Sequence, residues 1–369
     1  MTTPSARQWT INGRFLTQNQ TGVQRYCERI VRALDELITE GHPAVAGLSL
    51  EIAVPSRTVR SLPLTNIPVR ELPRLSGHAW EQFVLPLAIR GGLLSLGNTG
   101  PVVLRKQIVC IHDTNVWLYP ESYAPAFRAV YRMLLPGLGR RAAAITTVSD
   151  FSASQLSKFG ICAANRINLI GNGHEHAHDW TARRPSSLSK AAGRNTIVLL
   201  GSPAPHKNVG LILGLSHELA ERGIHIAVVG ERDPRVFGEL APSMDAENVH
   251  YLGRLSDDEL AALLADSLCL VFPSHTEGFG LPAVEAMALG CPVILSNSSC
   301  LPEIGGDAAL YASPRDATEW LACIDRLKGN PDLRRELIAK GKHQAAKFSW
   351  RQSAIRYAEL MQRIDGQAA

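Results

Sequence analysis

The sequence contains no long apolar run. No stretch approaches the roughly 20 uninterrupted apolar residues that a helix needs to span a bilayer. Residues 1–10 also lack the apolar core of a signal peptide. Low-complexity tracts and repeats of solenoid length are absent as well. We therefore expect a globular protein that resides in the cytoplasm.

Cysteine is scarce, and its distribution does not predict disulfides. The seven cysteines are scattered and odd in number, and several lie in apolar runs such as Gln107–Ile111. This pattern is typical of buried free thiols in a reducing compartment. It agrees with the cytoplasmic location expected from the missing signal peptide.

The chain also lacks the strong charge of a nucleic-acid binder. Its formal net charge is only +4, which gives no reason to expect nucleic acid but suits an anionic substrate or membrane surface. Basic residues gather in the first half, at Arg105, Lys106, Arg128, Arg132, Arg140 and Arg141. They are either ordinary solvated charges or a surface for a lipid-linked acceptor at the inner face of the membrane. The sequence does not indicate an oligomeric state.

The length of 369 residues favours two domains, since one ordinary hydrophobic core does not grow that large. Strand-like runs alternate with segments of helical period in both halves, which predicts α/β folding twice over. The expected strands are Gln8–Asn12, Leu48–Val54, Leu93–Leu96, Ile108–Ile111, Ala143–Val148, Ile167–Ile170, Thr196–Gly201, Ile224–Gly230, Leu268–Phe272 and Pro292–Leu295. Because ligands bind beyond the carboxyl ends of parallel strands, two such sheets facing each other would form a cleft.

The best candidate for a linker is a polar passage of small residues without apolar period, at 181–195. It separates a Rossmann-like domain at 1–180 from a second Rossmann-like domain at 196–348. The remaining residues, 349–369, are expected to form a helix that can cross back to the first domain.

The strongest motif is Ser274–Gly290, where two glutamates flank a glycine-rich turn between an apolar strand and a helix. Glycines allow the backbone to approach a ligand closely, and the helix N-terminus offers N–H groups to a diphosphate. Glu277 can accept hydrogen bonds from sugar hydroxyls and Glu285 from a ribose diol. A surface loop with two solvated glutamates is the alternative interpretation.

This segment resembles the Glu-x7-Glu signature of retaining GT-B glycosyltransferases of family GT4, including the Gly-Phe-Gly after the first glutamate. The resemblance extends over the second half and more loosely over the first. It implies that Glu277 contacts the donor sugar and Glu285 the nucleotide ribose. It also implies a GT-B fold and places four further residues at the donor: Gly278, Phe279, Gly280 and Leu281.

The second motif, Gly201–Asn208, follows the first strand of the second half and resembles the family's phosphate-binding segment. The position of Lys207 in this segment implies that its ammonium neutralises the leaving diphosphate and so has a catalytic role in breaking the bond to the sugar. Where members carry an arginine this chain has His206. The cationic clamp is then weaker, depends on protonation of the histidine, or is completed from elsewhere.

Two further segments of the first half resemble family landmarks. Gly22 and Val23 begin a helix behind the loop Gly13–Gln20, and the resemblance implies that their backbone N–H groups approach the diphosphate. His112 ends an apolar strand, and the resemblance implies a catalytic contact with the donor sugar. Its neighbour Asp113 is expected to cap the following turn.

No metal site is expected. The alternate histidines of Gly173–Asp179 lack a recognised ligand spacing, and no Asp-x-Asp pair accompanies the diphosphate segment. We therefore expect a metal-independent reaction without cofactor, in which Lys207 and helix dipoles take the place of a cation.

The resemblance implies transfer of a hexose from a nucleotide diphosphate sugar to a hydroxyl of a glycan or lipid-linked oligosaccharide in bacterial surface polysaccharide synthesis. GDP-mannose is the favoured donor, ahead of UDP-hexoses. A GT-B nucleotide-sugar epimerase and a noncatalytic nucleotide-sugar-binding scaffold are the alternatives. The epimerase would need acid and base groups placed for elimination.

Overall fold

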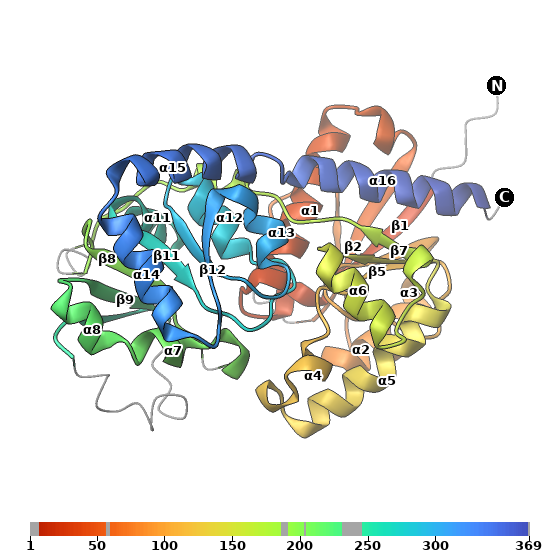
Figure 1. Cartoon of the computed structure of the whole chain (residues 1–369). Helices are drawn as coiled ribbons and strands as arrows, with labels where there is room; N and C mark the ends of the chain where they lie inside the picture. The colour runs from red at the N-terminus through yellow and green to blue at the C-terminus, as the bar shows by residue number, and fades with distance from the viewer. Residues whose placement is uncertain (1–6, 57–59, 186–190, 203, 231–245, 368–369) are drawn as a thin grey trace. The chain divides into compact units, whose positions relative to one another are not determined.

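The computed structural model describes residues 7–56, 60–185, 191–202, 204–230 and 246–367. It divides the chain into two compact units. Unit 1 comprises residues 1–117, 124–173 and 349–369, and unit 2 comprises residues 118–123 and 174–348. Figure 1 labels many of the helices and strands of both units. Both units are α/β, as predicted.

The sheet of unit 1 has seven parallel strands in the order β3-β2-β1-β4-β5-β6-β7. The strands are β1 (Arg7–Asn12), β2 (Leu48–Pro55), β3 (Val69–Leu72), β4 (Gly92–Ser95), β5 (Gln107–Cys110), β6 (Ala144–Thr147) and β7 (Ile167–Leu169). β4, β5 and β6 are buried along their whole length, as strands covered on both faces must be. The strand order reverses between β1 and β4, which creates a topological switch point at their carboxyl ends.

Helices and short 3-10 turns connect these strands. They are η1 (Gly13–Thr17), α1 (Gly22–Thr39), η2 (Pro43–Val45), α2 (Gly77–Phe83), α3 (Leu85–Ala88), α4 (Asn115–Leu118), α5 (Pro125–Arg141), α6 (Asp150–Lys158), η4 (Ala164–Arg166) and α16 (Trp350–Gln367). α1 buries an apolar stripe that includes Cys27, Ile30 and Leu34, and α16 packs against α1. Three bonded hydroxyls fix this contact, because Tyr357 Oη lies 2.9 Å from Tyr26 Oη and 2.8 Å from Thr146 Oγ1.

The sheet of unit 2 has six parallel strands in the order β10-β9-β8-β11-β12-β13. They are β8 (Thr196–Leu200), β9 (His225–Val229), β10 (Val249–Gly253), β11 (Cys269–Phe272), β12 (Val293–Ser296) and β13 (Ala309–Ala312). Trp320, Leu213 and Ile226 belong to the apolar core of this unit. The order reverses between β8 and β11, so the second switch point lies where these two strands end.

The connecting elements of unit 2 cover this sheet. They are η3 (Pro120–Ser122), η5 (Glu175–Asp179), η7 (Pro205–Lys207), α7 (Val209–Leu213), α8 (Ser216–Glu221), α11 (Asp257–Asp266), α12 (Leu281–Ala288), α13 (Leu301–Gly305), η9 (Gly306–Ala308), α14 (Ala317–Lys328) and α15 (Pro331–Ala345). α11 begins at a capping box formed by Ser256 and Glu259. Among the described residues, no helix is both long and apolar enough to cross a membrane.

The division between the units differs from the predicted boundaries at 180 and 196. Residues 174–180 belong to unit 2, so this unit begins before the polar passage. The His174 amide donates to the Phe348 carbonyl at 3.2 Å, and the Thr181 amide donates to Asp258 Oδ1 at 2.9 Å. Arg184 pairs with Asp266. The start of the predicted linker is therefore held on unit 2, while its residues 186–190 lie outside the described part of the chain.

The segment Gly13–Gln20, which the sequence suggests is a polar loop, begins as a buried turn. Gly13 to Leu16 are buried in η1, and a Cβ on Gly13 would lie 2.5 Å from Val54 Cγ1. Burial of Arg14 is explained by its ion pair with Glu81, whose side chain is fully buried. Only the tertiary structure supplies this partner.

Candidate functional site

Glu277 lies in the loop between β11 and α12, at the switch point of the second sheet. The apolar strand β11 is fully buried and delivers the chain to this edge. Gly280 closes the loop with φ +87°, and a Cβ there would come within 2.7 Å of Leu301 Cδ2. Only glycine fits both the backbone conformation and the space. The Glu277 amide donates to Ser299 Oγ at 3.1 Å, which fixes the residue at the loop's tip.

Lys207 reaches Glu277 from the neighbouring strand of the switch point. Its Nζ lies 2.7 Å from Oε1 and 2.9 Å from Oε2 of Glu277. The glutamate side chain is 10% exposed and the lysine side chain 28%, so the pair borders solvent without being fully solvated. The sequence places these residues 70 positions apart, and the structure makes them one ion pair with both carboxylate oxygens engaged.

The backbone around Lys207 is tied to the Glu277 loop by further hydrogen bonds. Asn208 adopts the left-handed conformation at φ 54°, and its side-chain Nδ2 donates to the carbonyls of Pro273 and Pro314 at 3.1 and 2.8 Å. The His275 amide donates to the His206 carbonyl at 2.8 Å. Lysine and glutamate are therefore held by a shared scaffold as well as by their charges. Pro203 of the same motif lies outside the described residues.

Glu285 has a partner that sequence reasoning missed. It lies on α12, and its Oε1 accepts a hydrogen bond from His176 Nε2 at 2.8 Å. Both side chains are buried. His176 was considered above only among the alternate histidines of a rejected metal site. Its bond holds the Glu285 carboxylate, whose contact with the nucleotide ribose stays a prediction. No sequence spacing indicates a contact between residues 109 positions apart.

The described residues contain no group of three or more histidine, cysteine, aspartate or glutamate side chains arranged to hold a metal ion. The histidines near residue 176 have other partners. His174 Nδ1 lies 2.6 Å from the Phe348 carbonyl, and the His174 and His178 rings meet edge to face at 5.1 Å.

His206 is buried next to a short segment of unit 2 that includes η3. Its Nδ1 lies 3.0 Å from Ser122 Oγ, and its ring stacks with Tyr123 at a centroid distance of 6.4 Å. Burial lowers the pKa of His206 to about 4, with repulsion from Lys207 as the next cause. The imidazole is therefore neutral near neutral pH in the unliganded protein. The three alternatives for the cationic clamp, including its dependence on protonation of His206, stay predictions.

A pH-dependent stability follows from His206. Its pKa is about 4 in the folded protein and about 6.5 in an unfolded chain, so the unfolded state binds more protons between these values. Stability is therefore lost as the pH falls through this window, by about 2 kcal/mol at pH 5. We expect His206→Gln to lose less unfolding free energy than wild type between pH 7 and pH 5 in urea titrations. The exposed His217→Gln is the control, and equal losses in all three proteins would contradict the assignment.

The other residues of unit 2 that were predicted to contact the donor differ in their burial. The Phe279 side chain is buried and meets Phe348 edge to face at 5.3 Å, and Leu281 is buried at the start of α12. Their side chains therefore pack in the interior, and the donor contacts assigned to Phe279 and Leu281 stay predictions. Gly278 is partly exposed beside Glu277.

In unit 1, His112 follows β5 as predicted, but its ring faces the interior. Nε2 lies 2.8 Å from the Leu96 carbonyl oxygen, and Tyr26 meets the ring edge to face at 4.7 Å. Burial opposes the imidazolium, yet Cys110 and the Leu96 carbonyl favour it more, and the pKa of His112 is raised. The sugar contact assigned to His112 stays a prediction, and its Nε2 has a competing partner. Asp113 caps the next turn, since its Oδ1 accepts the Asn115 amide at 2.8 Å.

The helix start predicted at Gly22 and Val23 is present, since α1 begins at Gly22. Thr21 occupies the N-cap position, but its side chain makes no cap hydrogen bond to the backbone. Its hydroxyl is bonded to the Gln24 side chain instead. The diphosphate contact of Gly22 and Val23 stays a prediction.

A buried polar cluster in unit 1 was also missed by sequence reasoning. Glu81 Oε1 accepts from Asn12 Nδ2 at 2.7 Å and from Arg14 Nε at 3.2 Å, while Oε2 accepts from Thr99 Oγ1 at 2.8 Å. His78 Nδ1 lies 3.2 Å from the same Oε2. The cluster occupies the carboxyl ends of β1 and β4, at the switch point of the first sheet. Glu81 stands among the apolar residues of the segment Gly77–Ala88, so the sequence did not indicate that its charge is buried.

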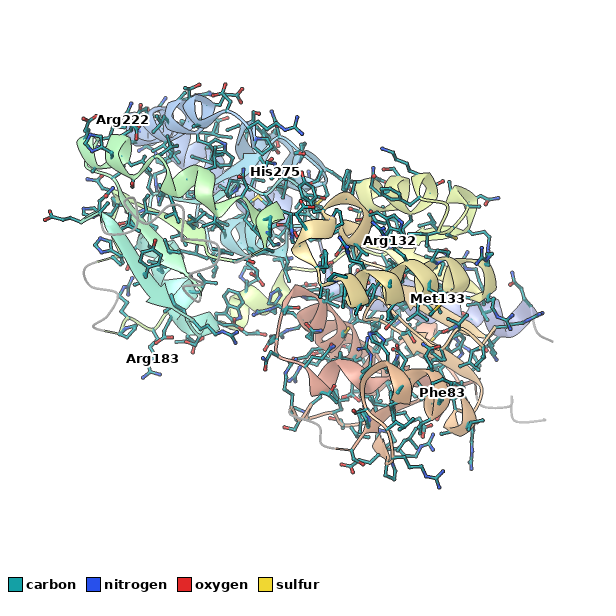
Figure 2. The ribbon with its side chains drawn as sticks, turned by 90° about the horizontal axis from the view of Figure 1, so that it is seen from below. Phe83, Arg132, Met133, Arg183, Arg222 and His275 are labelled. Atoms are coloured by element: carbon teal, nitrogen blue, oxygen red, sulfur yellow. The ribbon has the colours of Figure 1, made fainter. Side chains whose placement is uncertain are left out.

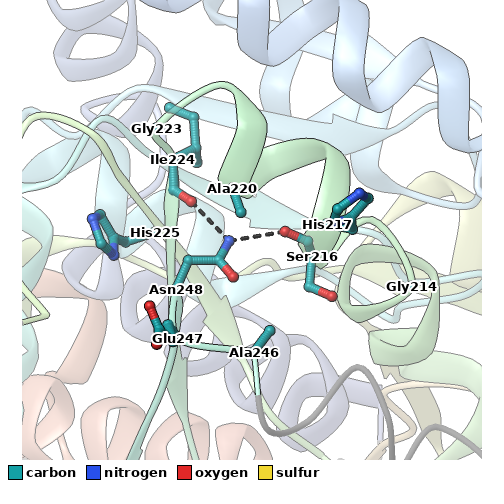
Figure 3. Close-up of a pocket in the computed structure, with 10 residues that line it drawn as sticks. All are labelled: Gly214, Ser216, His217, Ala220, Gly223, Ile224, His225, Ala246, Glu247 and Asn248. Atoms are coloured by element: carbon teal, nitrogen blue, oxygen red, sulfur yellow. Dashed lines mark hydrogen bonds between the residues drawn. The ribbon is translucent and has the colours of Figure 1, made fainter.

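A pocket of about 640 Å³ in unit 2 does not coincide with these residues (Figure 3). It lies at the amino ends of β9 and β10, where His225, Glu247 and Asn248 line it. Lys207 and Glu277 follow the carboxyl ends of β8 and β11, at the opposite edge of the sheet. The amide nitrogen of Asn248 is bonded to the carbonyls of Ser216 and Ile224, both at 2.9 Å. We assign the candidate site from the switch point and its charged pair.

Comparison with known proteins identifies the family of the chain. The family model described as glycosyl transferases group 1 matches residues 182–344. O-antigen chain mannosyltransferase B of Escherichia coli is 33% identical over 264 residues, which are 68% of each chain. O-antigen chain mannosyltransferase RfbU of Salmonella typhimurium is 27% identical over 269 residues, covering 70% of this chain and 73% of the relative.

The solved structure of a sucrose-phosphate synthase from Thermosynechococcus elongatus superposes with a TM-score of 0.73. It covers 98% of this chain and 99% of its own, at 18% sequence identity. At that identity the likeness shows the fold alone. The GT-B fold expected from the sequence is thereby confirmed.

Proposed function

Because the chain belongs to the glycosyl transferases group 1 family, and is thus a glycosyltransferase, we propose that it transfers mannose from GDP-mannose with retention of configuration. The acceptor is a hydroxyl of a glycan or lipid-linked oligosaccharide in the synthesis of a bacterial surface polysaccharide. Two relatives named O-antigen chain mannosyltransferases support the sugar and the product class. UDP-hexoses are the second donor class.

The observation that carries the proposal is the Lys207–Glu277 pair at the switch point of unit 2. A carboxylate held with both oxygens in place is suited to bind paired sugar hydroxyls. The ammonium beside it is suited to the oxygen on which charge develops as the diphosphate leaves. The first turn of α12 adds N–H groups for the same anion. The bond between His176 and Glu285 on α12 supports the proposed contact of Glu285 with the ribose diol.

The proposed reaction loosens the bond between the sugar C1 and the phosphate oxygen toward an oxocarbenium-like state. The acceptor oxygen then bonds to C1 on the face that the phosphate leaves. The acceptor proton passes to the departing diphosphate, so the nucleoside diphosphate and the glycoside are the two products. Lys207 holds the growing phosphate charge in place of a metal ion, and we propose that the reaction is metal-independent.

The test combines donor binding with product analysis. A panel of sugar nucleotides is screened by thermal unfolding, where a donor at about 100 times its Kd stabilises the fold by about 2.7 kcal/mol. We expect GDP-mannose to shift the melting temperature most. Incubation with GDP-mannose and a mannoside acceptor is then followed by NMR, in the presence of a chelator, and an α-mannoside is expected.

Each other outcome contradicts a stated part of the proposal. A larger shift with a UDP-hexose would replace the donor, and a β-linked product would exclude retention. Loss of turnover in chelator would exclude metal independence. An isomerised sugar nucleotide formed from donor alone would favour an epimerase, and binding without turnover on any acceptor would favour a scaffold.

A further inference from the structure

The pocket at the amino ends of β9 and β10 has no part in the proposed reaction. Its volume of about 640 Å³ lies within the range of about 300–1,000 Å³ that small-molecule sites occupy. A strand of five residues, such as β8, spans about 16 Å, so the pocket and the Lys207–Glu277 pair are separate sites. Figure 2, a view from below, labels Arg222, which precedes Gly223 of the pocket, well away from His275 of the Glu277 loop.

A buried side chain in the lining of this pocket has an unsatisfied acceptor. Asn248 is 7% exposed, and its Nδ2 donates to the carbonyls of Ser216 and Ile224. Both amide hydrogens are thereby used, so a flipped amide would set Oδ1 against two carbonyl oxygens. Oδ1 has no hydrogen-bond partner among the described residues, and Figure 3 shows it pointing away from both carbonyls, toward the space beside Ala246. A buried acceptor of this kind calls for a donor.

Ser216 adds a second polar group that is not engaged by the pocket's own residues. It is 4% exposed, and none of the residues that line the pocket bonds to its hydroxyl (Figure 3). A hydroxyl can donate one hydrogen bond and accept others. Because Asn248 holds the Ser216 carbonyl, the hydroxyl and the Asn248 acceptor are fixed relative to each other.

Two further side chains of the lining are suited to the same kind of ligand. The His225 ring stacks on His250 at a centroid distance of 5.2 Å, and its Nδ1 lies 3.1 Å from His250 Nε2. The other nitrogen of His225 can meet a ligand, as a donor in one tautomer and as an acceptor in the other. Exposed Glu247 supplies a carboxylate, which accepts hydrogen bonds.

The lining also indicates the class of ligand. None of the described residues that line the pocket is a lysine or arginine, so an anion would meet the Glu247 carboxylate without a strong counter-charge. The apolar lining consists of Ile224, alanines and glycines, so a large apolar group would gain little contact. A hydroxyl-rich ligand fits, because each hydroxyl can donate to Asn248 Oδ1 or Glu247 and accept from Ser216. For a glycosyltransferase, the ligand of this class is the glycan on which it acts.

We propose that this pocket is a second glycan site, which holds a sugar residue of the acceptor or product chain away from the reacting hydroxyl. The sugar hydroxyls bond to Asn248 Oδ1, Ser216 Oγ and the Glu247 carboxylate. No covalent bond forms or breaks there, so the site acts on the binding of long glycans and not on the chemical step. The choice of a glycan rests on the proposed acceptor class, while the site itself lies beyond the proposed reaction.

The experiment measures binding of mannose, glucose and galactose oligosaccharides to the full chain without donor, by calorimetry and by hydrogen exchange. Wild type is expected to bind at least one of them, with slowed exchange in residues 214–225 and 246–250. Ala220→Trp sets a large side chain in the lining and should weaken this binding at least tenfold. Ser216→Ala should weaken it about threefold to tenfold, the effect of one neutral hydrogen bond. Both variants should keep the wild-type melting temperature, because Ala220 is exposed and the Ser216 hydroxyl bonds to none of the lining residues.

The matched control is Ala339→Trp, which adds the same side chain at an exposed position of α15 and should bind like wild type. Absence of exchange protection in the two segments with every oligosaccharide would overturn the inference, as would protection that persists in Ala220→Trp or an equal loss in the control. The shift in melting temperature that the donor causes should be the same in Ala220→Trp as in wild type. Lack of any donor shift, with the pocket still protected by an oligosaccharide, would overturn the proposed function and leave the glycan site standing.

Discussion

Replacement of Glu277 with alanine is expected to lower kcat/KM for transfer by about 10³-fold or more while leaving the fold intact. The carboxylate is held by both contacts of the Lys207 ammonium, so it meets the donor sugar without reorganisation. Loss of one preorganised polar group that acts on the transition state costs about 10²–10³ in rate. Loss of the hydroxyl contacts adds to this effect. Steady-state kinetics with GDP-mannose and a mannoside acceptor measure the change.

The fold should tolerate this substitution because the partner left behind can be solvated. The Lys207 side chain is 28% exposed, so its charge reaches water when the carboxylate is removed. We expect a change of about 1 kcal/mol in unfolding free energy. The control is Glu336→Ala, which removes the carboxylate of a surface pair with Lys340 at 2.8 Å. Activity of Glu277→Ala within tenfold of wild type, with Glu336→Ala also active, would displace Glu277 from the reaction.

Replacement of Lys207 with alanine has two expected effects. Transfer should fall by about 10²–10³-fold, because no ammonium remains beside the departing diphosphate. Lys207→Arg keeps the charge and should lose only about tenfold, since its planar group differs in geometry. Stability should also fall, by about 3 kcal/mol, because the Glu277 side chain is only 10% exposed and its charge would be left unpaired. Kinetics and urea unfolding measure the two effects separately.

A double variant distinguishes the effect of the Lys207–Glu277 ion pair from the effects of its two residues. Lys207→Ala with Glu277→Ala should be more stable than Lys207→Ala alone, since the unpaired carboxylate is removed with its partner. It should remain as inactive as either single variant, because residues that act as a unit are not additive. Lys340→Ala is the control for a surface lysine. If the double variant is less stable than Lys207→Ala, the ion pair is not what the lysine contributes.

The central strands and the edge strand β7 could be predicted from the sequence, and the other three edge strands could not. β5, β6 and β11 read as short apolar runs because neighbours cover both faces and both edges. The three strands missed are β3, β10 and β13, and each lies at the edge of its sheet. β3 reads Val-Arg-Glu-Leu and is only half covered, so its composition does not differ from a loop. Edge strands gain their structure from pairing, which a local pattern does not contain.

The residues of the candidate site could likewise be predicted only in part from the sequence. Glu277, Glu285 and Lys207 could be named as candidates because their motifs, which combine glycine, proline and charged residues at strand ends, resemble those of the family. His176 and Asn208 were not, since they act through contacts with residues far away in the sequence. The neutral state of His206 could not be predicted from the sequence either. Its pKa depends on burial next to the segment 118–123, and burial of one residue by another part of the chain leaves no local trace.

The helix α16 gives the protein an order of assembly. Asp365 accepts hydrogen bonds from Trp9 Nε1 and Arg7 Nε, both at 3.1 Å, and pairs with Lys106 at 2.7 Å. All three partners leave the ribosome long before their acceptor does. Since domains generally fold as they are synthesised, residues 174–348 can complete a sheet while β1 and α1 still await their covering helix. We therefore expect unit 1, whose first strands are translated first, to complete its packing after unit 2.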